Sequence, residues 1–401
     1  MPDPATAPLP LPSTTPVAVM GAGAMGTGIA QVALLRGHPV ALLDARPEAL
    51  DRARPALERA LGRAVEKGRL TDDARRDALA RLTLASADQP HALGDAGLVI
   101  EAVVEDLEVK RALFRELEAA VGDACVLATN TSSLSVGAIA AACRRPERVV
   151  GIHFFNPAPV MPLVEIVPGV ATSAHVAATA RATVDAWGKT TVAASDTPGF
   201  IVNRIARPFY GEAIRLVEEG IADAPTVDWA LHELAGFRMG PFELMDFIGN
   251  DVNYAVTRSV WEGFFHDPRY TPSFTQRRLV EAGWLGLKTE RGHYDYRDGA
   301  PRPAPTRDPL LGQAIVDRVL AMLVNEAVDA VYLRVASPAD VELAMTRGVN
   351  YPRGLLAWGN ALGLDTVLAR LDALHAEYLE SRYRASPLLR RMVREGRSFE
   401  L

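Results

Sequence analysis

The chain has 401 residues, of which 49% are hydrophobic and 23% are charged, and its formal net charge is -6. This composition excludes a chain that is disordered throughout, and the length predicts two or three domains. The net acidic charge argues against nucleic acid as a partner, and no apolar run reaches the roughly 18 residues that span a bilayer. We therefore expect a cytoplasmic protein that binds neither nucleic acid nor membrane.

The cysteine content and the first residues bear on the compartment. Cys125 and Cys143 are too few for a disulfide framework and lack metal-site spacing, so we expect a reducing environment and no bound metal. Six prolines fall among the first sixteen residues, and no basic cluster precedes an apolar stretch there. Residues 1–15 are therefore predicted to be a flexible tail and not a signal peptide.

Residues 16–198 alternate short apolar runs with amphipathic stretches. Helical patterns separate most of these runs, which predicts a mostly parallel sheet covered by helices on both faces. We expect an α/β domain of the Rossmann type over this range. The predicted strands, chosen for length and β-branched content, are residues 17–20, 40–43, 98–102, 126–129, 149–154 and 163–167.

The chain after residue 198 has a helical pattern that occurs twice. Residues 201–217 align with residues 315–331, and residues 248–251 align with residues 362–365 at the same offset of 114. An equal offset at two places indicates a true repeat. The predicted parts are an all-α domain at 199–296, a proline-rich linker at 297–308 and a second all-α copy at 309–401.

A glycine-rich turn follows the first predicted strand. Gly21, Gly23 and Gly26 form a GxGxxG sequence in which the first glycine makes the turn, the second admits a pyrophosphate and the third lets helix pack on strand. Asp44 ends the next apolar run, where its carboxylate would accept hydrogen bonds from a ribose and repel a 2′-phosphate. NAD is therefore favoured over NADP, although Arg46 can soften this preference. The structural alternative is a glycine turn beside a solvated aspartate.

His153 and Glu165 lie in consecutive predicted strands. Glu165 is surrounded in sequence by apolar residues, and a buried carboxylate needs a partner because burying an unpaired charge is prohibitive. His153 is the simplest partner. An imidazole backed by a carboxylate can take a hydroxyl proton as hydride leaves carbon, which is the chemistry of a dehydrogenase. The alternatives are a structural histidine, and an edge strand whose Glu165 points to water.

Ser132 and Asn203 are further candidates for a site at this sheet edge. Ser132 follows the predicted strand at 126–129, where its hydroxyl faces either a ligand or a helix end. Asn203 begins the first helix after the domain boundary. It either reaches back across the interdomain cleft or makes a local hydrogen bond at the helix end.

Charged residues on two helices suggest ligand contacts as well. Glu105 and Lys110 follow the strand at 98–102 on the nucleotide side of the sheet, and their alternative interpretation is a solvated ion pair. Arg59, Arg63 and Lys67 recur every four residues and share one helix face. Such a stripe suits the phosphates of a substrate tail, or it is simply a solvated face.

These motifs, in this order, resemble the L-3-hydroxyacyl-CoA dehydrogenase family, which includes bacterial 3-hydroxybutyryl-CoA dehydrogenases. The resemblance covers residues 16–296 closely and the second copy more weakly. The sequences that follow the family pattern are VMGAGAMGTGIAQVALLRGHPVALLD, EAVVEDLEVKRALF, NTSSL, GIHFFNPAPVMPLVEIV, DTPGFIVNR and MGPFELMDFIG.

The resemblance implies a role for each candidate. His153, in HFFNP, takes the place of the catalytic base, and Glu165, in LVEIV, that of its orienting partner. Ser132 and Asn203 correspond to residues at the substrate oxygen on C3. Lys67 is offered for coenzyme A, in a helix where the family varies. The positions of the family's NAD contacts are Gly21, Gly23, Gly26, Asp44, Glu105, Lys110 and Lys288.

Two departures from the family pattern matter. Near Lys288 this chain has Arg291 and His293 where the family usually has glycine and phenylalanine. In the second copy Asp317 stands where Asn203 stands in the first, and no second glycine loop or HFFNP occurs. We therefore expect one active site per chain, with the second copy acting as a pseudo-partner of the first. The chain would be a homodimer, or a monomer containing this pseudo-dimer.

The activity implied is the reversible, NAD-dependent oxidation of a (3S)-3-hydroxyacyl-CoA, such as 3-hydroxybutyryl-CoA, to the 3-oxoacyl-CoA in fatty-acid β-oxidation. The chain is expected to lack the hydratase domain that precedes this module in multifunctional proteins. Tandem helical copies also resemble 3-hydroxyadipyl-CoA dehydrogenases of phenylacetate breakdown, and no residue decides the acyl group. Two rival functions stay open, namely a dehydrogenase of a free hydroxy acid or sugar acid and a non-catalytic NAD-binding protein.

Overall fold

The computed structural model describes residues 9–401, and its contacts divide the chain into two compact units between Thr197 and Pro198. We call them the sheet unit and the helical unit. Residues 1–8 of the predicted tail lie outside the described residues. Leu11, also in that tail, packs against the core of the sheet unit, and its backbone N–H donates to Thr183 Oγ1 at 3.0 Å.

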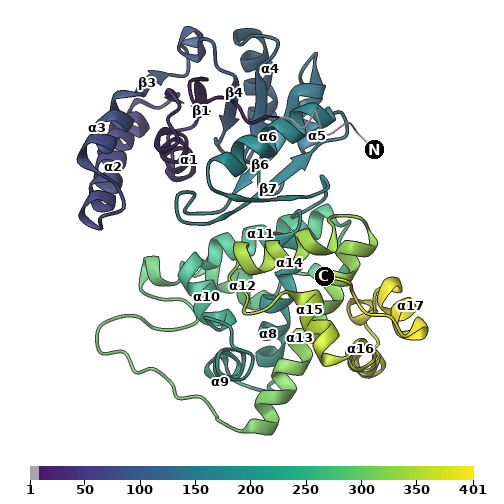
Figure 1. The fold of residues 1–401 in the computed structure, drawn as a ribbon. Helices are drawn as coiled ribbons and strands as arrows, with labels where there is room; N and C mark the ends of the chain where they lie inside the picture. Colours follow the sequence, from purple (N-terminus) through teal and green to yellow (C-terminus); the bar gives the residue numbers. More distant parts are fainter. Residues whose placement is uncertain (1–8) are drawn as a thin grey trace. The chain divides into compact units, whose positions relative to one another are not determined.

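The sheet unit is an α/β domain, as predicted, with helices on both sides of one sheet (Figure 1). Its elements are β1 (Val17–Met20), α1 (Ala24–Leu35), β2 (Val40–Asp44), α2 (Pro47–Glu66), α3 (Asp72–Ala80), β3 (Leu82–Ser86), η2 (Pro90–Leu93), β4 (Leu98–Glu101), α4 (Leu107–Ala120), β5 (Val126–Thr129), α5 (Val136–Ala140), η3 (Pro146–Arg148), β6 (Val149–Phe154), β7 (Leu163–Pro168), α6 (Ala174–Ala186) and β8 (Thr190–Ala193).

The eight strands lie in the order β3-β2-β1-β4-β5-β6-β7-β8. Neighbouring strands are parallel except β6 and β7, which are antiparallel, so the prediction of a mostly parallel sheet is confirmed. Strands β3 and β8, at the two edges of the sheet, were not predicted. Polar residues interrupt both of them, Thr83 and Ser86 in β3 and Thr190 and Thr191 in β8. An edge strand needs less continuous apolar character than a central one because only one of its edges pairs with a neighbour.

Helices α1, α2 and α6 cover one face of the sheet. Their buried side chains share a core with alternate strand residues such as Ile100 and Ala128. Strand side chains alternate between faces, so Val99 and Leu127 point the other way. There they are buried on the side of α4 and α5, which contact each other and contribute Phe114 and Ile139. Because the helices cover the two faces of the sheet, the loops that follow β1, β4, β5 and β6 lie at its edge, at the carboxyl ends of these strands.

His38 is a buried histidine that joins the amino-terminal segment to α6. It is 2% exposed, its Nδ1 lies 2.9 Å from the carbonyl oxygen of Thr15, and Trp187 Nε1–H donates to its Nε2 at 3.0 Å. These two contacts together require the neutral ring with its proton on Nδ1. Burial lowers the pKa of His38 below its ordinary value of 6.5, although the hydrogen bond to Thr15 opposes the shift.

We expect the stability of the sheet unit to fall as the pH drops below about 6.5. The unfolded chain then binds a proton at His38 that the folded chain excludes, so the contribution is complete above this pH and is lost progressively below it. The midpoint of thermal unfolding by circular dichroism, measured from pH 8 to pH 5, should therefore fall less steeply in His38→Gln than in the parent chain. Equal slopes would contradict the assignment.

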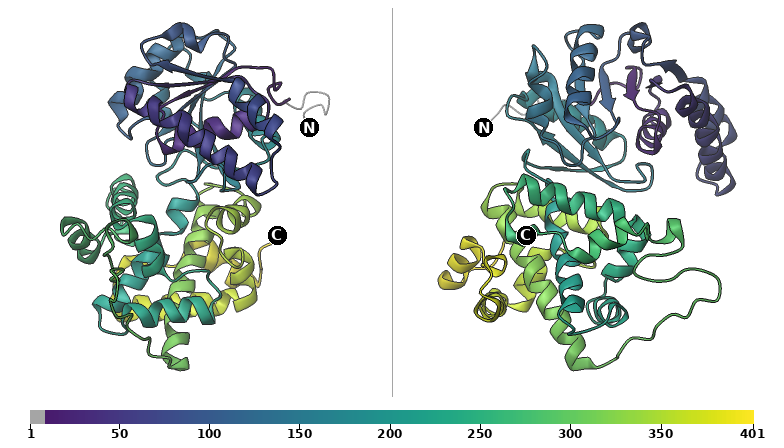
Figure 2. Two further views of the ribbon diagram at one scale, coloured as in Figure 1. Left: turned by 90° about the vertical axis from the view of Figure 1, so that its left-hand side faces the viewer. Right: turned by 180° about the vertical axis from the view of Figure 1, so that it is seen from behind.

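The helical unit contains both copies of the predicted repeat (Figure 2). The elements of the helical unit are α7 (Val202–Ile205), α8 (Arg207–Glu218), α9 (Ala224–Trp229), the π-helical turn η4 (Ala230–Leu234), α10 (Pro241–Ile248), α11 (Asn250–Gly263), η5 (Pro268–Tyr270), α12 (Phe274–Glu281), η6 (Leu287–Thr289), α13 (Pro309–Tyr332), α14 (Pro338–Gly348), α15 (Leu355–Leu362), α16 (Leu364–Tyr378), η7 (Ser381–Tyr383) and α17 (Pro387–Glu395). Within residues 9–401, no helix combines the length and apolar character needed to cross a membrane.

Equivalent residues of the two copies make equivalent contacts. Asp228 accepts hydrogen bonds from the backbone at the start of α10, and Glu342, 114 residues later, does so at the start of α15. At each site a glycine, Gly240 or Gly354, approaches the carboxylate so closely that an added Cβ would collide with it. The structure and the sequence therefore agree that this part of the chain is a repeat.

The two copies pack on each other through reciprocal ion pairs. Arg204 of the first copy binds Glu326 of the second, with Nε 2.6 Å from Oε1, and Arg318 of the second binds Glu212 of the first, with Nε 2.9 Å from Oε2. Such an exchange of equivalent contacts is the pattern of a two-fold interface between identical subunits. It explains why the copies and the segment joining them, which were predicted as separate parts, form one compact unit.

Candidate active site

The glycine loop between β1 and α1 has room for a ligand at one position. A Cβ at Gly21, where φ is +105°, would lie 2.5 Å from the carbonyl oxygen of Ala102, and a Cβ at Gly26 would lie 1.7 Å from that of Gly21. At Gly23 the same atom would meet nothing within 4 Å. Gly23 also precedes α1 without a side-chain cap, so the first N–H groups of the helix are directed at this space.

Asp44 ends β2 beside this loop. Its Oδ2 accepts a hydrogen bond from the backbone N–H of Ala22 at 2.8 Å, and its Oδ1 accepts one from that of Arg46 at 2.9 Å. The carboxylate is 8% exposed, whereas the Arg46 side chain is 70% exposed and its Nε lies 3.4 Å from Oδ1. The loop and the carboxylate thus form one unit, with the features of a pyrophosphate and ribose site.

His153 and Glu165 are directly opposite each other in the antiparallel pair β6 and β7. His153 Nδ1 lies 2.6 Å from Glu165 Oε2, and the side chains are 6% and 0% exposed. The alternative in which Glu165 points to water from an edge strand is wrong, because β8 covers that side of β7. The Phe155 ring packs against the imidazole, with 4.6 Å between ring centroids.

Glu105 holds the loop that contains Ser132. Its Oε1 accepts hydrogen bonds from Thr131 Oγ1 at 2.6 Å and from the backbone N–H groups of Ser132 and Ser133 at 2.9 and 3.1 Å. Partial burial opposes ionisation of this carboxyl, but Lys110 and these donors outweigh it and hold the pKa of Glu105 below its usual value. Glu105 therefore carries a negative charge beside Ser132 at neutral pH.

Lys110 is buried and not part of a solvated pair. Its Nζ lies 2.5 Å from Glu101 Oε1 and 3.1 Å from Glu105 Oε2, and its side chain is 1% exposed. Glu101, at the end of β4, also accepts a hydrogen bond from Thr129 at 2.7 Å. Lys110 thus connects the end of β4 to Glu105 and, through Glu105, to the Ser132 loop.

A wide pocket lies beside the glycine loop, between α1, α2 and the segment after β6. It measures about 990 Å³ and includes Gly23, Arg63 and Lys67 in its lining, but not Arg59. Among the described residues that line it, none is an aspartate or a glutamate. The basic side chains around it are Arg36, Arg46, Arg52, Arg63, Lys67 and Arg69.

Asn203 and Lys288 belong to the helical unit. Asn203 lies in α7, and its carbonyl oxygen accepts a hydrogen bond from Arg207 Nε at 2.7 Å. Lys288 lies in η6 and pairs with Asp251, whose Oδ1 is 2.5 Å from Nζ; both side chains are more than a third exposed. Asp317, the counterpart of Asn203 in the second copy, pairs with Arg370 at 2.9 Å. This ion pair joins α13 to α16 within the second copy.

Comparison with models of known protein families shows the family to which the chain belongs. Residues 16–197 match the 3-hydroxyacyl-CoA dehydrogenase NAD binding domain, and residues 199–296 and 315–399 each match the 3-hydroxyacyl-CoA dehydrogenase C-terminal domain. The chain belongs to the 3-hydroxyacyl-CoA dehydrogenase family. The resemblance seen in the sequence, the duplicated helical domain and the use of NAD are thereby confirmed, and the protein is an NAD-dependent dehydrogenase.

Relatives of this dehydrogenase carry names with different acyl groups. A 3-hydroxyadipyl-CoA dehydrogenase of Escherichia coli K12 is 40% identical over 93% of this chain and 96% of the relative. A 3-hydroxybutyryl-CoA dehydrogenase of Bradyrhizobium diazoefficiens is 43% identical over 73% and 98%. A crystal structure described as 3-hydroxybutyryl-CoA dehydrogenase from Escherichia coli K12 matches with a TM-score of 0.89 and 39% identity, over 96% of this chain and 99% of that one.

Glu101 of the dehydrogenase was not predicted from the sequence. Like Glu165, it is a carboxylate in an otherwise apolar strand, and it is 0% exposed. The argument that a buried carboxylate needs a partner applied to it equally, and would have identified Lys110 as that partner. Arg52 and Arg69 were missed for another reason, since neither belongs to the stripe of Arg59, Arg63 and Lys67.

Proposed function

We propose that the dehydrogenase oxidises the hydroxyl at C3 of a (3S)-3-hydroxyacyl-CoA to the 3-oxoacyl-CoA, reversibly. The observation that carries this proposal is the buried pair of His153 and Glu165, with 2.6 Å between Nδ1 and Oε2. Because Nδ1 is engaged with the carboxylate, Nε2 is the ring nitrogen that takes the hydroxyl proton. Glu165 fixes the ring orientation and stabilises the imidazolium that forms.

Ser132 and Asn203 are proposed to hold the C3 oxygen while its charge changes. Ser132 is suited to this because Glu105 fixes the backbone on both sides of its hydroxyl. Asn203 is assigned by the family pattern. The proton accepted by His153 and the oxygen held by Ser132 and Asn203 are thus handled by separate groups, so each can be tested by its own substitution.

The proposed NAD contacts are the glycine loop, Asp44, Glu105, Lys110 and Lys288. The open space at Gly23 and the uncapped start of α1 fit a pyrophosphate, and the Asp44 carboxylate beside them fits ribose hydroxyls. NAD supplies the acceptor for the hydride that leaves C3. Lys110 is proposed to act mainly by holding Glu105, since its Nζ is occupied by two carboxylates.

The coenzyme A part of the substrate is assigned to the basic pocket beside α2. Six cationic side chains without an acidic one among the described lining residues suit the phosphates of coenzyme A in a chain whose net charge is -6. This pocket favours a coenzyme A ester over a free hydroxy acid or sugar acid. It also argues against a protein that binds only NAD, because the basic lining continues from Gly23 along α2 as far as Lys67 and Arg69.

The test is an assay of NADH formation with matched substrates. We expect turnover with 3-hydroxybutyryl-CoA or 3-hydroxyadipyl-CoA and none with the corresponding free acids. Turnover of the free acids alone would instead indicate a dehydrogenase of a free hydroxy acid or sugar acid. NADH binding without turnover of any acyl-CoA would leave a non-catalytic protein.

Lys67→Ala is expected to raise the KM for the acyl-CoA about tenfold, because one charge-assisted contact to phosphate is lost, while kcat changes little. Arg59→Ala is the matched control, since Arg59 lies on the same helix but does not line the pocket. Steady-state kinetics with varied acyl-CoA measure both. If the two variants behave alike, the stripe on α2 is only a solvated face.

The second helical copy is proposed to take the place of a partner subunit. The reciprocal pairs of Arg204 with Glu326 and of Arg318 with Glu212 support this, because through them each copy binds the other copy of the same chain. The proposal also places the enzyme in a reducing cytoplasm, which suits the free and buried thiols of Cys125 and Cys143.

A further inference from the structure

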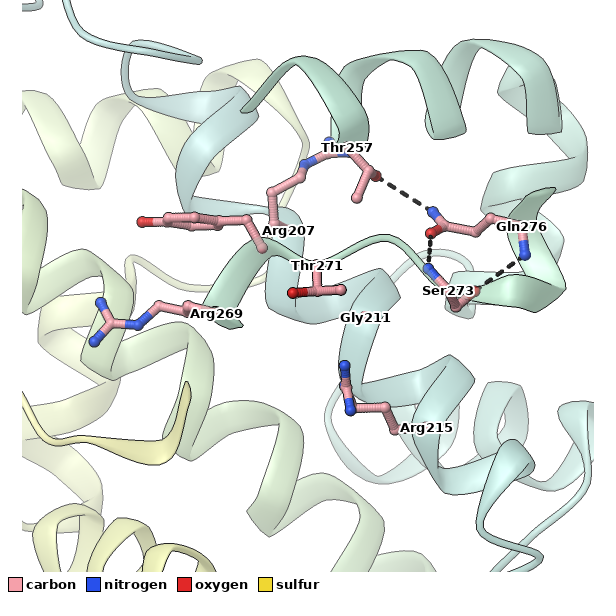
Figure 3. Close-up of a pocket in the computed structure, with 9 residues that line it drawn as sticks. Arg207, Gly211, Arg215, Thr257, Arg269, Thr271, Ser273 and Gln276 are labelled. Carbon is pink, nitrogen blue, oxygen red and sulfur yellow. Dashed lines mark hydrogen bonds between the residues drawn. The ribbon is translucent and has the colours of Figure 1, made fainter. Parts of the chain in front are cut away.

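A small pocket in the helical unit is lined by arginines and hydroxyl groups (Figure 3). Arg207 and Arg215 extend into it from α8, Thr257 from α11, and Thr271 from the segment before α12. It measures about 20 Å³, which is room for one water-sized group. None of the described residues in the lining is acidic.

Arg207 is the unusual member of this group. It is 7% exposed, and its Nε and Nη1 donate to the carbonyl oxygen of Asn203 at 2.7 Å and to Thr257 Oγ1 at 3.1 Å. Its guanidinium carbon also lies 5.0 Å from the centre of the Tyr210 ring. In the part of the chain that the structure describes, no carboxylate lies within 4.0 Å of this guanidinium.

A buried guanidinium without a counter-ion is costly, because it loses hydration and gains no opposite charge. The other buried arginines of the helical unit avoid this. Arg204 and Arg269 pair with Glu326 and Asp329, and Arg318 pairs with Glu212. Burial lowers the pKa of Arg207, and the groups that oppose this shift are tyrosines, not carboxylates. The charge therefore calls for an anion from outside the chain.

The remaining donors of the pocket suit the same ligand. Arg215 is 20% exposed and, among the described carboxylates, lies within 4.0 Å of Glu212 alone, at 3.8 Å. Glu212 and the more distant Glu219 are both engaged by Arg318. The Thr271 hydroxyl makes no hydrogen bond to another described residue. Guanidinium groups and hydroxyls offer donors arranged for the planar or tetrahedral oxygens of a carboxylate or phosphate.

We propose that this pocket is an oxyanion site, in which one oxygen of a carboxylate or phosphate group enters the pocket and binds Arg207 while Arg215 and Thr271 bind the remainder at the mouth. Two sources of such a group are open to test. One is a free ion such as phosphate. The other is the far end of a dicarboxylic acyl-CoA, because Arg207 Nε donates to the backbone carbonyl of Asn203, the residue proposed to hold the C3 oxygen.

The site is tested by hydrogen–deuterium exchange of the full chain with saturating NADH and coenzyme A, which fill the pockets of the sheet unit. We expect sodium phosphate, compared with sodium chloride at equal ionic strength, to slow exchange in peptides covering residues 207–215 and 257–276, with saturation. Arg207→Met should abolish this protection and raise the thermal midpoint in chloride, since it removes an unpaired charge. Arg278→Met, an exposed arginine of α12 outside the pocket, should retain the protection.

Arg215→Met provides a second test at the mouth of the pocket, where substitution disturbs the core less. It should weaken the apparent phosphate affinity about three- to tenfold. The proposal is overturned if phosphate and chloride protect the parent chain equally, or if Arg207→Met retains the saturable protection.

The source of the anion is distinguished with 3-hydroxyadipyl-CoA and 3-hydroxyhexanoyl-CoA, which have six-carbon chains and differ in the terminal carboxylate. If the substrate supplies the anion, Arg207→Met should lower kcat/KM about tenfold or more for the dicarboxylic substrate alone, and phosphate should compete with it. If a free ion does, both substrates should respond alike. This arm rests on the proposed function. Absence of turnover with either substrate would refute that function and leave the exchange result standing.

Discussion

Replacing His153 by alanine is expected to lower the turnover of a 3-hydroxyacyl-CoA by a factor of roughly 100 to 10,000. The imidazole has a carboxylate directly behind it, 2.6 Å from Nδ1, and without this ring the hydroxyl proton has to leave to water. The glycine loop and Asp44 lie on other strands, so NADH binding should be unchanged. Stopped-flow measurement of NADH formation, with NADH fluorescence for binding, gives both quantities.

Two further variants make this result specific. Glu165→Gln keeps a hydrogen-bonding group beside Nδ1 but removes the charge that stabilises the imidazolium, so its turnover should lie between those of the parent chain and His153→Ala. His175→Ala removes an exposed histidine at the start of α6 and should leave turnover unchanged. Full activity in His153→Ala would eliminate the proposed mechanism, and loss of NADH binding would point to a damaged fold instead.

Glu326→Ala is expected to lower the free energy of unfolding of the helical unit by about 3–5 kcal/mol. Glu326 is 0% exposed, binds Arg204 and Arg269, and accepts a hydrogen bond from Tyr270 at 2.5 Å. Its removal leaves two arginines in the interior with only Asp329 to share. Urea unfolding followed by circular dichroism measures the change.

The pH dependence of the same cluster has a definite sign. Burial opposes ionisation of Glu326, but Arg204 and Arg269 outweigh it and lower the pKa of this carboxyl. Its contribution to stability is therefore present above the ordinary pKa of a glutamate and is lost as the pH falls below it. Asp372→Ala, which breaks an exposed pair with Arg390, is the control and should cost less than about 1 kcal/mol. A similar cost for Glu326→Ala would mean that the reciprocal pairs do not hold the copies together.

The sequence predicted the site best where the signal was local. The glycine loop is contiguous, and its geometry follows from the strand before it and the helix after it, so Gly21, Gly23 and Gly26 were found from spacing alone. His153 and Glu165 lie on consecutive strands, and the apolar surroundings of Glu165 required a nearby partner. The edge strands β3 and β8 gave too weak an apolar signal to be predicted.

Predictions that depended on distant residues were less complete. Glu105 and Lys110 were singled out together, but the contacts of Glu105 with the Ser132 loop and of Lys110 with Glu101 were not predicted, because they depend on how β4 and β5 pair. Likewise the repeat was seen in the sequence, whereas the exchange of partners between its copies was not. Ion pairs between segments more than 100 residues apart leave no periodic pattern in the chain.

The sequence by itself therefore determined the mostly parallel α/β domain, the glycine-rich loop, the pairing of a histidine with a glutamate and the duplication of the helical domain. Each of these rests on short-range order, in which neighbouring residues set turn, periodicity or the need for a buried charge to be neutralised. Only the tertiary structure decided which charges meet. It paired Arg204 with Glu326 across the two copies and left Arg207 without a carboxylate among the described residues, because the balance of a buried charge depends on every element packed around it.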